Sequence, residues 1–200
     1  MTSDLTFITN EPGQSLKERF ETLIKDTRFF DCLVGYFYTS GFYLIYKALE
    51  NTEKIRILIG INTSKKTYDL LKTAVQEEKH SFQFSHAETK QEVEKFVEKE
   101  IEDSEDNQKV EEGVSKFIGW IRSKKLEIRA YPSQNIHAKL YIMTFTEEDR
   151  DVGRVITGSS NFTQAGLADN FEFNVELKNR ADYEFAKNKF EELWKDAVMV

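Results

Sequence analysis

The sequence contains a single cysteine, Cys32, which lies within an apolar run. One cysteine excludes an intramolecular disulfide framework, so a reducing cytoplasm is the natural compartment and a small buried hydrophobe is the natural role of Cys32. No apolar stretch approaches the roughly 20 residues that a membrane-spanning helix requires. The start of the chain, Met1–Asp4, lacks the basic and apolar regions of an export signal. We therefore expect a cytoplasmic protein without a membrane partner.

Metal-binding and repetitive patterns are also missing. No Cys/His spacing of a zinc site and no EF-hand loop occurs, and the carboxylates between Glu98 and Glu112 are better explained as the solvated face of amphipathic helices. There is no internal repeat, low-complexity tract or Pro/Gly-rich linker. With 40% hydrophobic and 13% aromatic residues, the 200 residues are enough for one sizeable core. We expect one domain over residues 1–200, with no metal and no cofactor.

Positive charge is scarce, since the formal net charge is −7. An acidic chain argues mildly against tight autonomous DNA binding, because phosphate binding normally leaves a basic footprint. The distribution is uneven, however. Acidic residues crowd between Glu88 and Glu112, whereas basic residues cluster later, at Arg122, Lys124, Lys125, Arg129 and Lys139. This pattern is compatible with a local positive site on an acidic body.

The first 61 residues alternate between strand and helix patterns. Ser15 and Glu18 form a capping-box pattern, which predicts a helix over about 15–25. Apolar runs at Arg28 to Tyr38 and Lys54 to Ile61 predict two strands covered on both faces, and Thr39 with Ser40 opens a helix between them. This alternation favours an α/β sheet with largely parallel pairing.

A helical section is expected over residues 62–125, because apolar residues recur there at helical spacing. The three stripes are Tyr68, Leu71 and Val75; Val93, Phe96, Val97 and Ile101; and Val110, Val114, Phe117, Ile118 and Ile121. The final third is strand-rich. Its expected strands are Leu126 to Tyr131, His137 to Met143, Arg154 to Gly158 and Asn170 to Lys178, and its closing helix carries the stripe Tyr183, Ala186, Phe190, Leu193 and Trp194. His80 and His86 fall in the charged middle and are expected on the surface.

Two side chains capable of phosphate chemistry lie in the second of these strands. Strand residues alternate faces, so His137 and Lys139 are expected on one side, with Ala138 and Leu140 on the other. An imidazole beside an ammonium suits an anion such as phosphate, which uses both a nucleophile and a fixed positive charge. A lone His-x-Lys is also typical of a solvent-facing pair, so the tripeptide alone does not decide.

Two further segments carry polar groups in a suggestive order. Thr157–Thr163 reads TGSSNFT and places a glycine, hydroxyls and an amide at a strand end, where they suit phosphate oxygens, although an ordinary turn has the same composition. In Phe171–Leu177, alternation puts Glu172, Asn174 and Glu176 on one face. One of these carboxylates could hold the second nitrogen of the histidine and fix its tautomer.

The combination IHAKLYIM, GSSNFTQAGL and NFEFNVEL resembles the motif of the phospholipase D superfamily, in which His-x-Lys is followed by Gly-Ser-x-Asn and then by Glu. The matching residues are His137, Lys139, Ser159, Asn161 and Glu172. Thr144 stands where the family usually has the Asp of its histidine-lysine-aspartate (HKD) motif, but some nuclease members also lack this Asp. The match covers about 40 residues, and the section 62–125 does not map onto the family. The resemblance implies the family's fold, a mixed and largely parallel sheet flanked by helices, here with a helical insertion in the middle.

The resemblance also implies an activity. It indicates a metal-independent endonuclease that hydrolyses nucleic acid, with DNA favoured over RNA. In such an enzyme His137 forms a phosphohistidine, Lys139, Asn161 and Ser159 bind the phosphate, and Glu172 orients His137. The family uses two histidines and this chain has one motif, so a homodimer with a shared site is implied. The single motif looks most like members found alone, in restriction enzymes or at the front of helicases. We therefore expect a fragment or first domain of a longer protein, with a fused helicase domain as a partner.

Two alternatives remain open at the level of sequence. A non-catalytic DNA-binding or targeting module of a helicase or restriction system is favoured somewhat by Thr144 and the acidic charge. A phospholipase or phosphatidyl transferase would use the same site on a lipid headgroup, but should show an apolar membrane-facing segment.

Overall fold

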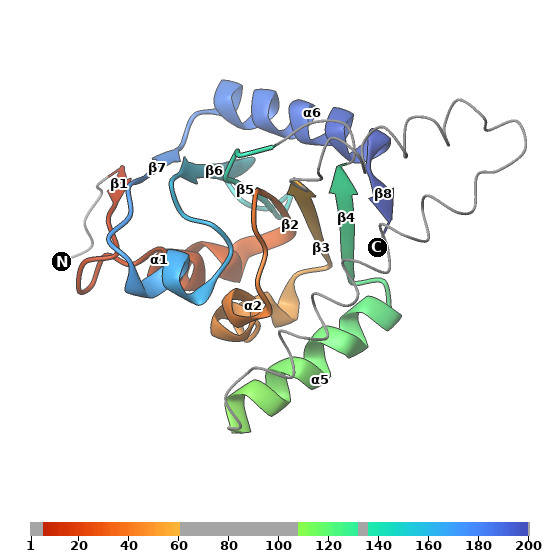
Figure 1. Cartoon of the computed structure of the whole chain (residues 1–200). Coiled ribbons are helices and arrows are strands. Elements are labelled where there is room, and N and C mark those ends of the chain that lie inside the picture. The colour runs from red at the N-terminus through yellow and green to blue at the C-terminus, as the bar shows by residue number, and fades with distance from the viewer. Residues whose placement is uncertain (1–5, 61–107, 132–135, 200) are drawn as a thin grey trace, which may run out of the picture.

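The computed structural model describes residues 6–60, 108–131 and 136–199. Eight strands form one sheet in the order β1-β7-β6-β5-β2-β3-β4-β8 (Figure 1). The strands are β1 Phe7–Ile8, β2 Thr27–Val34, β3 Lys54–Gly60, β4 Leu126–Tyr131, β5 Leu140–Phe145, β6 Gly153–Gly158, β7 Asn174–Leu177 and β8 Val198–Met199. The helices are α1 Leu16–Leu23, α2 Thr39–Ile45, α5 Gln108–Arg122 and α6 Arg180–Asp196, with the short turns η1 Ile24–Asp26, η2 Ala48–Asn51 and η3 Ala165–Asp169.

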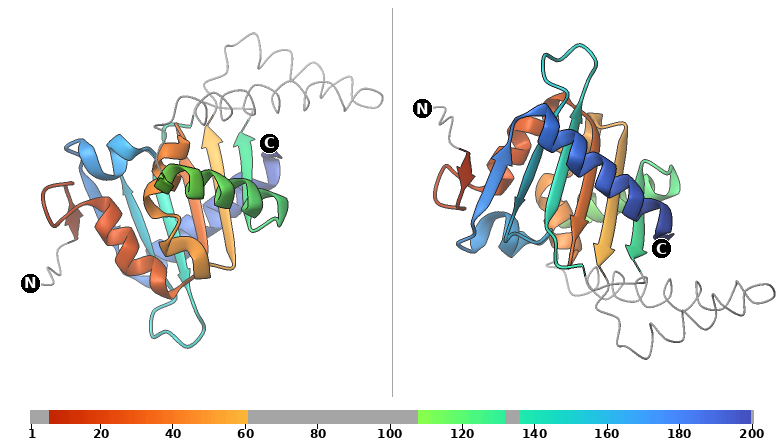
Figure 2. Two further views of the ribbon diagram at one scale, coloured as in Figure 1. Left: turned by 90° about the horizontal axis from the view of Figure 1, so that it is seen from below. Right: turned by 90° about the horizontal axis from the view of Figure 1, so that it is seen from above.

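Helices cover both faces of this sheet. Figure 2 shows α1, α2 and α5 on one face and α6 crossing the other. The expected mixed α/β sheet flanked by helices is thus confirmed. No helix in the described part of the chain combines the length and the apolar character needed to cross a bilayer.

The share of parallel pairing was predicted wrongly. Among the strands of the described residues, β2–β3 and β3–β4 are parallel, whereas β1–β7, β2–β5, β4–β8, β5–β6 and β6–β7 are antiparallel. The physical reason lies in the connections. A parallel neighbour needs a long crossover, but β5 and β6 are joined by the short turn 146–152, which returns the chain alongside itself.

The first helix follows its sequence signal closely. Ser15 Oγ accepts a hydrogen bond from the Glu18 amide at 3.2 Å, and the Glu18 carboxylate accepts one from the Ser15 amide at 3.0 Å. The bond from the Ser15 amide lowers the pKa of the Glu18 carboxyl. Leu16 and Phe20 are fully buried beneath the cap. The predicted capping box is therefore confirmed, and it sets where α1 begins.

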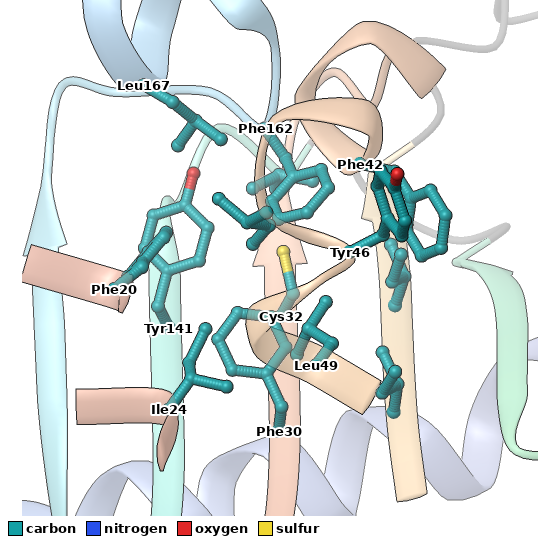
Figure 3. Close-up of a cluster of buried hydrophobic side chains, with 14 of the residues drawn as sticks. Phe20, Ile24, Phe30, Cys32, Phe42, Tyr46, Leu49, Tyr141, Phe162 and Leu167 are labelled. Atoms are coloured by element: carbon teal, nitrogen blue, oxygen red, sulfur yellow. The ribbon is translucent and has the colours of Figure 1, made fainter. Parts of the chain in front are cut away.

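The larger core lies between the sheet and the three helices α1, α2 and α5, which cover one of its faces. Figure 3 shows its centre, where rings from α1, α2, β5 and the segment after β6 surround β2; the labelled side chains include Phe20, Phe42, Tyr141, Phe162 and Leu167. Cys32 is fully buried there, and burial raises the pKa of its thiol well above the ordinary value. Each buried large side chain contributes roughly 1.5–3 kcal/mol. Cys32 is thus a core residue, as expected.

A second, smaller core lies under α6. The predicted stripe of that helix faces the sheet, with Tyr183, Ala186, Phe190 and Trp194 buried and Leu193 partly buried. The stripe predicted for α5 is narrower than expected. Phe117 is buried, but Ile118 and Ile121 are 38% and 41% exposed, because α5 meets the core along one line of residues only.

Two predicted strands begin later than expected. The strand expected from His137 starts at Leu140, and the strand expected from Asn170 starts at Asn174. In both cases the preceding residues pass the ends of other strands instead of pairing along them. The strand expected over Leu126 to Tyr131 coincides with β4. Within the predicted helical section, α5 is described; residues 61–107, including His80 and His86, lie outside the described residues.

Candidate functional site

Four neighbouring strands end at the same edge of the sheet. The carboxyl ends of β2 and β6 lie beside the amino ends of β5 and β7, as the pairs Leu33 with Leu140 and Gly158 with Asn174 show. This edge is the lower one in the right panel of Figure 2, opposite the β5–β6 turn. The residues that match the motif, namely His137, Lys139, Ser159, Asn161 and Glu172, lie within three residues of these strand ends. The fold therefore gathers them, although 35 residues separate His137 from Glu172 in the sequence.

His137 lies where the chain crosses the ends of β2 and β3. A Cβ atom on Gly35 would lie 3.2 Å from the Ile136 carbonyl oxygen and 3.8 Å from His137 Cα, and one on Gly60 would overlap the Ile136 carbonyl. The chain can pass this closely because both positions lack a side chain. His137 itself is exposed. Its imidazole is therefore open to a ligand at the edge of the sheet.

The side chain of Asn161 also lies beside Gly35. A Cβ atom on Gly35 would also lie 3.8 Å from Asn161 Oδ1, so this amide and the His137 backbone flank one point. Asn161 Oδ1 accepts a hydrogen bond from the Tyr36 amide at 3.3 Å. Because the oxygen is engaged, the amide Nδ2 is the group left to donate to an anion.

Lys139 contributes a half-buried cation. Its carbonyl oxygen accepts a hydrogen bond from Thr157 Oγ1 at 2.8 Å, which ties the backbone before β5 to β6. Within residues 6–60, 108–131 and 136–199, no carboxylate lies within 4.0 Å of the Lys139 ammonium. A half-buried charge without a partner is costly unless an anion binds beside it.

Glu172 has a different partner from the one expected. Its carboxylate accepts a hydrogen bond from Ser159 Oγ, and among the described residues no hydrogen bond joins it to the His137 ring. Ser159 is further held by Phe173, whose amide donates to Ser159 Oγ at 3.0 Å and whose carbonyl accepts from the Ser159 amide at 3.0 Å. The predicted contact between Glu172 and His137 is thus replaced by one that orients the Ser159 hydroxyl.

Two positioning residues were missed by sequence reasoning. Asn174 is fully buried; its Nδ2 donates to Ser160 Oγ at 2.8 Å, and its Oδ1 accepts from the Ser160 amide at 3.3 Å. Tyr141 donates its hydroxyl to the Ser160 carbonyl at 2.8 Å. Burial, with further contributions from Cys32 and Glu172, raises the pKa of Tyr141 well above its ordinary value, so the phenol stays a donor. The polar alternation around Asn174 was the available signal.

Thr144 lies away from this edge. It pairs with Phe29 and Gly153, four residues along β5 from Leu140, which corresponds to about 13 Å of strand. Its hydroxyl shares a hydrogen bond of 2.7 Å with the Tyr183 hydroxyl of α6. The one position that departs from the motif therefore supports the docking of α6.

The edge presents an exposed imidazole, an ammonium without a carboxylate partner among the described residues, an amide, and a hydroxyl that donates to Glu172. Together these groups can bind a tetrahedral oxyanion and attack or protonate it. No group of three or more His, Cys, Asp and Glu side chains that could hold a metal ion occurs in the described ranges.

A family model described as "Cardiolipin synthase, PLD-like domain" matches residues 22–194. That range includes every residue of the candidate site. Among curated proteins, none matches the sequence.

Two solved structures, Nuc and phosphatidylserine synthase, share the fold at low sequence identity. Nuc from Salmonella typhimurium, a phospholipase D family member, is 14% identical with a TM-score of 0.52, over 97% of this chain and 95% of that one. Phosphatidylserine synthase from Haemophilus influenzae is 14% identical with a TM-score of 0.54, over 97% of this chain and 39% of that one. The archaeal chromatin protein TrmBL2 is 17% identical with a TM-score of 0.46, and this chain spans 56% of its length.

Proposed function

The chain belongs to the phospholipase D superfamily, and on that premise we propose that it is a metal-independent phosphodiesterase. The proposed reaction is endonucleolytic hydrolysis of nucleic acid, with DNA favoured over RNA as the substrate. The proposed catalytic residues are His137, Lys139, Asn161 and Glu172, and Ser159 joins Lys139 and Asn161 in binding the phosphate. The proposed partners are nucleic acid, a second copy of the chain in the cytoplasm and, by resemblance, a fused helicase domain.

One observation carries the proposal. Lys139 is half-buried, its ammonium has no carboxylate partner among the described residues, and it directly precedes β5 at the edge where Gly35 brings His137 and Asn161 together. A phosphate group would supply the missing negative charge. It would also place phosphorus within reach of an imidazole.

The proposed reaction has two displacements. A nitrogen of His137 attacks phosphorus, the bond to the leaving oxygen breaks, and a second histidine gives that oxygen its proton. The second histidine then takes a proton from water, whose oxygen attacks phosphorus and breaks the phosphorus–nitrogen bond. Lys139 and the Asn161 amide would stabilise the charge on the equatorial oxygens in both steps.

The second histidine would come from another subunit, because the chain carries one motif histidine. A two-fold dimer would place His137 of the partner subunit across the same phosphate. Ser159 and Glu172 act in this proposal as a hydrogen-bonded pair. In this structure the carboxylate accepts the one proton of the Ser159 hydroxyl, so in this proposal the hydroxyl turns from Glu172 to donate to the phosphate when substrate binds.

Plasmid nicking in excess chelator tests the proposal directly. We expect wild-type protein to nick DNA under chelation, because the nucleophile is an imidazole and not a metal-bound water. The variant His137→Ala should be inactive, and Lys139→Met should lose about a hundred-fold in turnover, the order found when one transition-state donor is removed. Lys195→Met, on the exposed side of α6, is the matched control and should retain activity.

Other results would replace parts of the proposal. Nicking that chelator abolishes and magnesium restores would refute the phosphohistidine. DNA binding without any nicking would indicate the non-catalytic targeting module. Cardiolipin vesicles and an RNA transcript form two further arms, and hydrolysis of either one without nicking of DNA would reassign the substrate.

A further inference from the structure

The polarity of the segment leading into β7 is reversed relative to an ordinary edge of a sheet. Phe171 and Phe173 are 70% and 55% exposed, whereas Asn174 and Glu176 are 0% and 1% exposed. Large apolar side chains usually occupy the buried positions and carboxylates the exposed ones. Here the fold buries a carboxylate and leaves two phenyl rings in solvent.

This reversal is held in place by specific contacts. Glu176 receives a bidentate hydrogen bond from Arg19, at 2.6 and 2.9 Å, and an ion pair from Arg154 at 3.3 Å, which offset the cost of its burial. A slip of one residue would turn every side chain to the opposite face. The two arginines exclude that slip because they are placed to meet Glu176. The exposure of the rings is therefore part of the folded state.

The exposed rings form one contiguous surface, which we call the aromatic patch: Phe7, Phe171 and Phe173. Phe173 lies in the middle, with its ring centroid 5.9 Å from that of Phe7 and 6.0 Å from that of Phe171, both edge-on. Phe7 is itself 55% exposed. Single exposed apolar residues are common, but three adjoining rings mark a binding surface.

The patch is continuous with the candidate site. The Phe173 amide and carbonyl are both hydrogen-bonded to Ser159, and Glu172, which accepts from Ser159 Oγ, lies between Phe171 and Phe173 in the sequence. The patch therefore begins at the residue whose backbone holds Ser159, close enough along the chain for the neighbouring units of a bound polymer to reach it.

We propose that the aromatic patch is a stacking platform for the bases of single-stranded nucleic acid, which makes single strands the preferred substrate of the site; this rests on the proposed function. Aromatic side chains bind unpaired bases of any sequence through their faces, whereas the bases of a duplex are stacked on one another. The formal net charge of −7 means that the chain gains little affinity from the phosphate backbone, so binding of a nucleic acid needs attraction of another kind. Stacking supplies attraction that charge does not.

Binding of a fluorescent single strand of about 12 nucleotides and of the matching duplex tests this platform. All proteins carry His137→Ala, so that cleavage does not obscure binding. Adding Phe171→Ala should weaken single-strand binding about five-fold or more, the change that corresponds to roughly 1 kcal/mol of lost stacking. Phe171→Trp should preserve it, and duplex affinity should not change. Phe185→Ala is the control, since Phe185 is 73% exposed on α6 without belonging to the patch.

Unchanged single-strand affinity in Phe171→Ala, or an equal loss for single strand and duplex, would overturn the platform. Unchanged affinity together with a lower mass by light scattering would make the patch an interface between copies of the chain. Failure of the proposed function looks different: nicking by the protein with His137 intact would be absent while the single-strand preference and its dependence on Phe171 persist.

Discussion

At the scale of single residues, the candidate site depends on side chains that cannot themselves react. Asn161 is oriented by a backbone amide of Tyr36, and the turn between Ser159 and Asn161 is held through Ser160 by Asn174 and Tyr141. Because reacting groups must be placed within fractions of an ångström, loss of such support should reduce catalysis.

Asn174→Ala tests this support. The substitution leaves the buried amide and hydroxyl of Ser160 without partners, so we expect a loss of about 1–3 kcal/mol in the free energy of unfolding. Turnover should fall while KM changes less, because Asn161 and Ser159 would lose their alignment with the reacting phosphate. Urea denaturation and diester hydrolysis, measured where the variant is still folded, check both effects. Asn188→Ala, exposed on α6, should change neither.

Thr144→Val tests whether the departure from the family motif matters for chemistry. Valine keeps the shape of threonine but removes the hydrogen bond of 2.7 Å to Tyr183. We expect about 1 kcal/mol less stability and unchanged turnover. A large fall in kcat with intact stability would instead give Thr144 a role in the site.

At the scale of elements, α6 is attached to the sheet by a network of charges. Asp31 on β2 is fully buried and accepts a bidentate hydrogen bond from Arg56 on β3, at 2.6 and 2.9 Å. Arg56 also donates to Glu191 of α6, through Nη1 at 3.1 Å and through Nη2 at 2.5 Å. Burial opposes the charge of Arg56, but the bonds to Asp31 and Glu191 exceed it and raise the pKa of the guanidinium. Lys187, from the same helix, contacts Asp31 as well.

This network predicts an acid-sensitive attachment of α6. The hydrogen bond from Arg56 lowers the pKa of Glu191 below its ordinary value of 4.5. A depressed pKa in the folded state contributes stability that is present above 4.5 and is lost as pH falls through the folded value. The difference in unfolding free energy between wild type and Glu191→Gln should therefore be largest near neutrality and vanish in acid.

Urea denaturation over a series of pH values measures this difference. Glu184→Gln, which removes an exposed pair with Arg180 on the same helix, is the control and should show a small difference throughout. If the difference in unfolding free energy between wild type and Glu191→Gln stays constant from neutral to acidic pH, Glu191 does not make the attachment of α6 sensitive to acid.

At the scale of the whole molecule, the proposed reaction requires two subunits. The chain offers one motif histidine, while the two displacements need a nucleophile and a proton donor. The site lies at an edge of the sheet with His137 exposed, which permits a second copy to approach it. A permanent dimer should bury at least about 1,000 Å² in total.

Mixing subunits tests the shared site. When inactive His137→Ala chains exchange with wild-type chains, each mixed dimer holds a single copy of His137, so activity should fall more steeply than the wild-type fraction. A linear fall with full activity for each wild-type chain would contradict sharing, as would a monomer by light scattering that still cleaves DNA.

The sequence by itself determined the features that depend on neighbouring residues. Ser15 and Glu18 form their capping box because the two residues are one helical turn apart. The apolar stripe of α6 is buried because residues at helical spacing lie on one face of the helix, which packs against the sheet. The strand at Leu126–Tyr131 was also predictable, from a run of suitable residues. The sequence motif around His137 and Asn161 indicated the family for the same reason, since a motif is a local pattern.

Only the tertiary structure decided which distant residues meet. It set the antiparallel partners of β5, β6 and β7, gave Glu172 the Ser159 hydroxyl as a partner, and placed Asn174 beneath Ser160. Glu176 is buried because Arg19, 157 residues earlier, reaches it. Such contacts depend on how the whole chain closes around its core. The periodicity or motif of a single segment does not predict these contacts between distant residues.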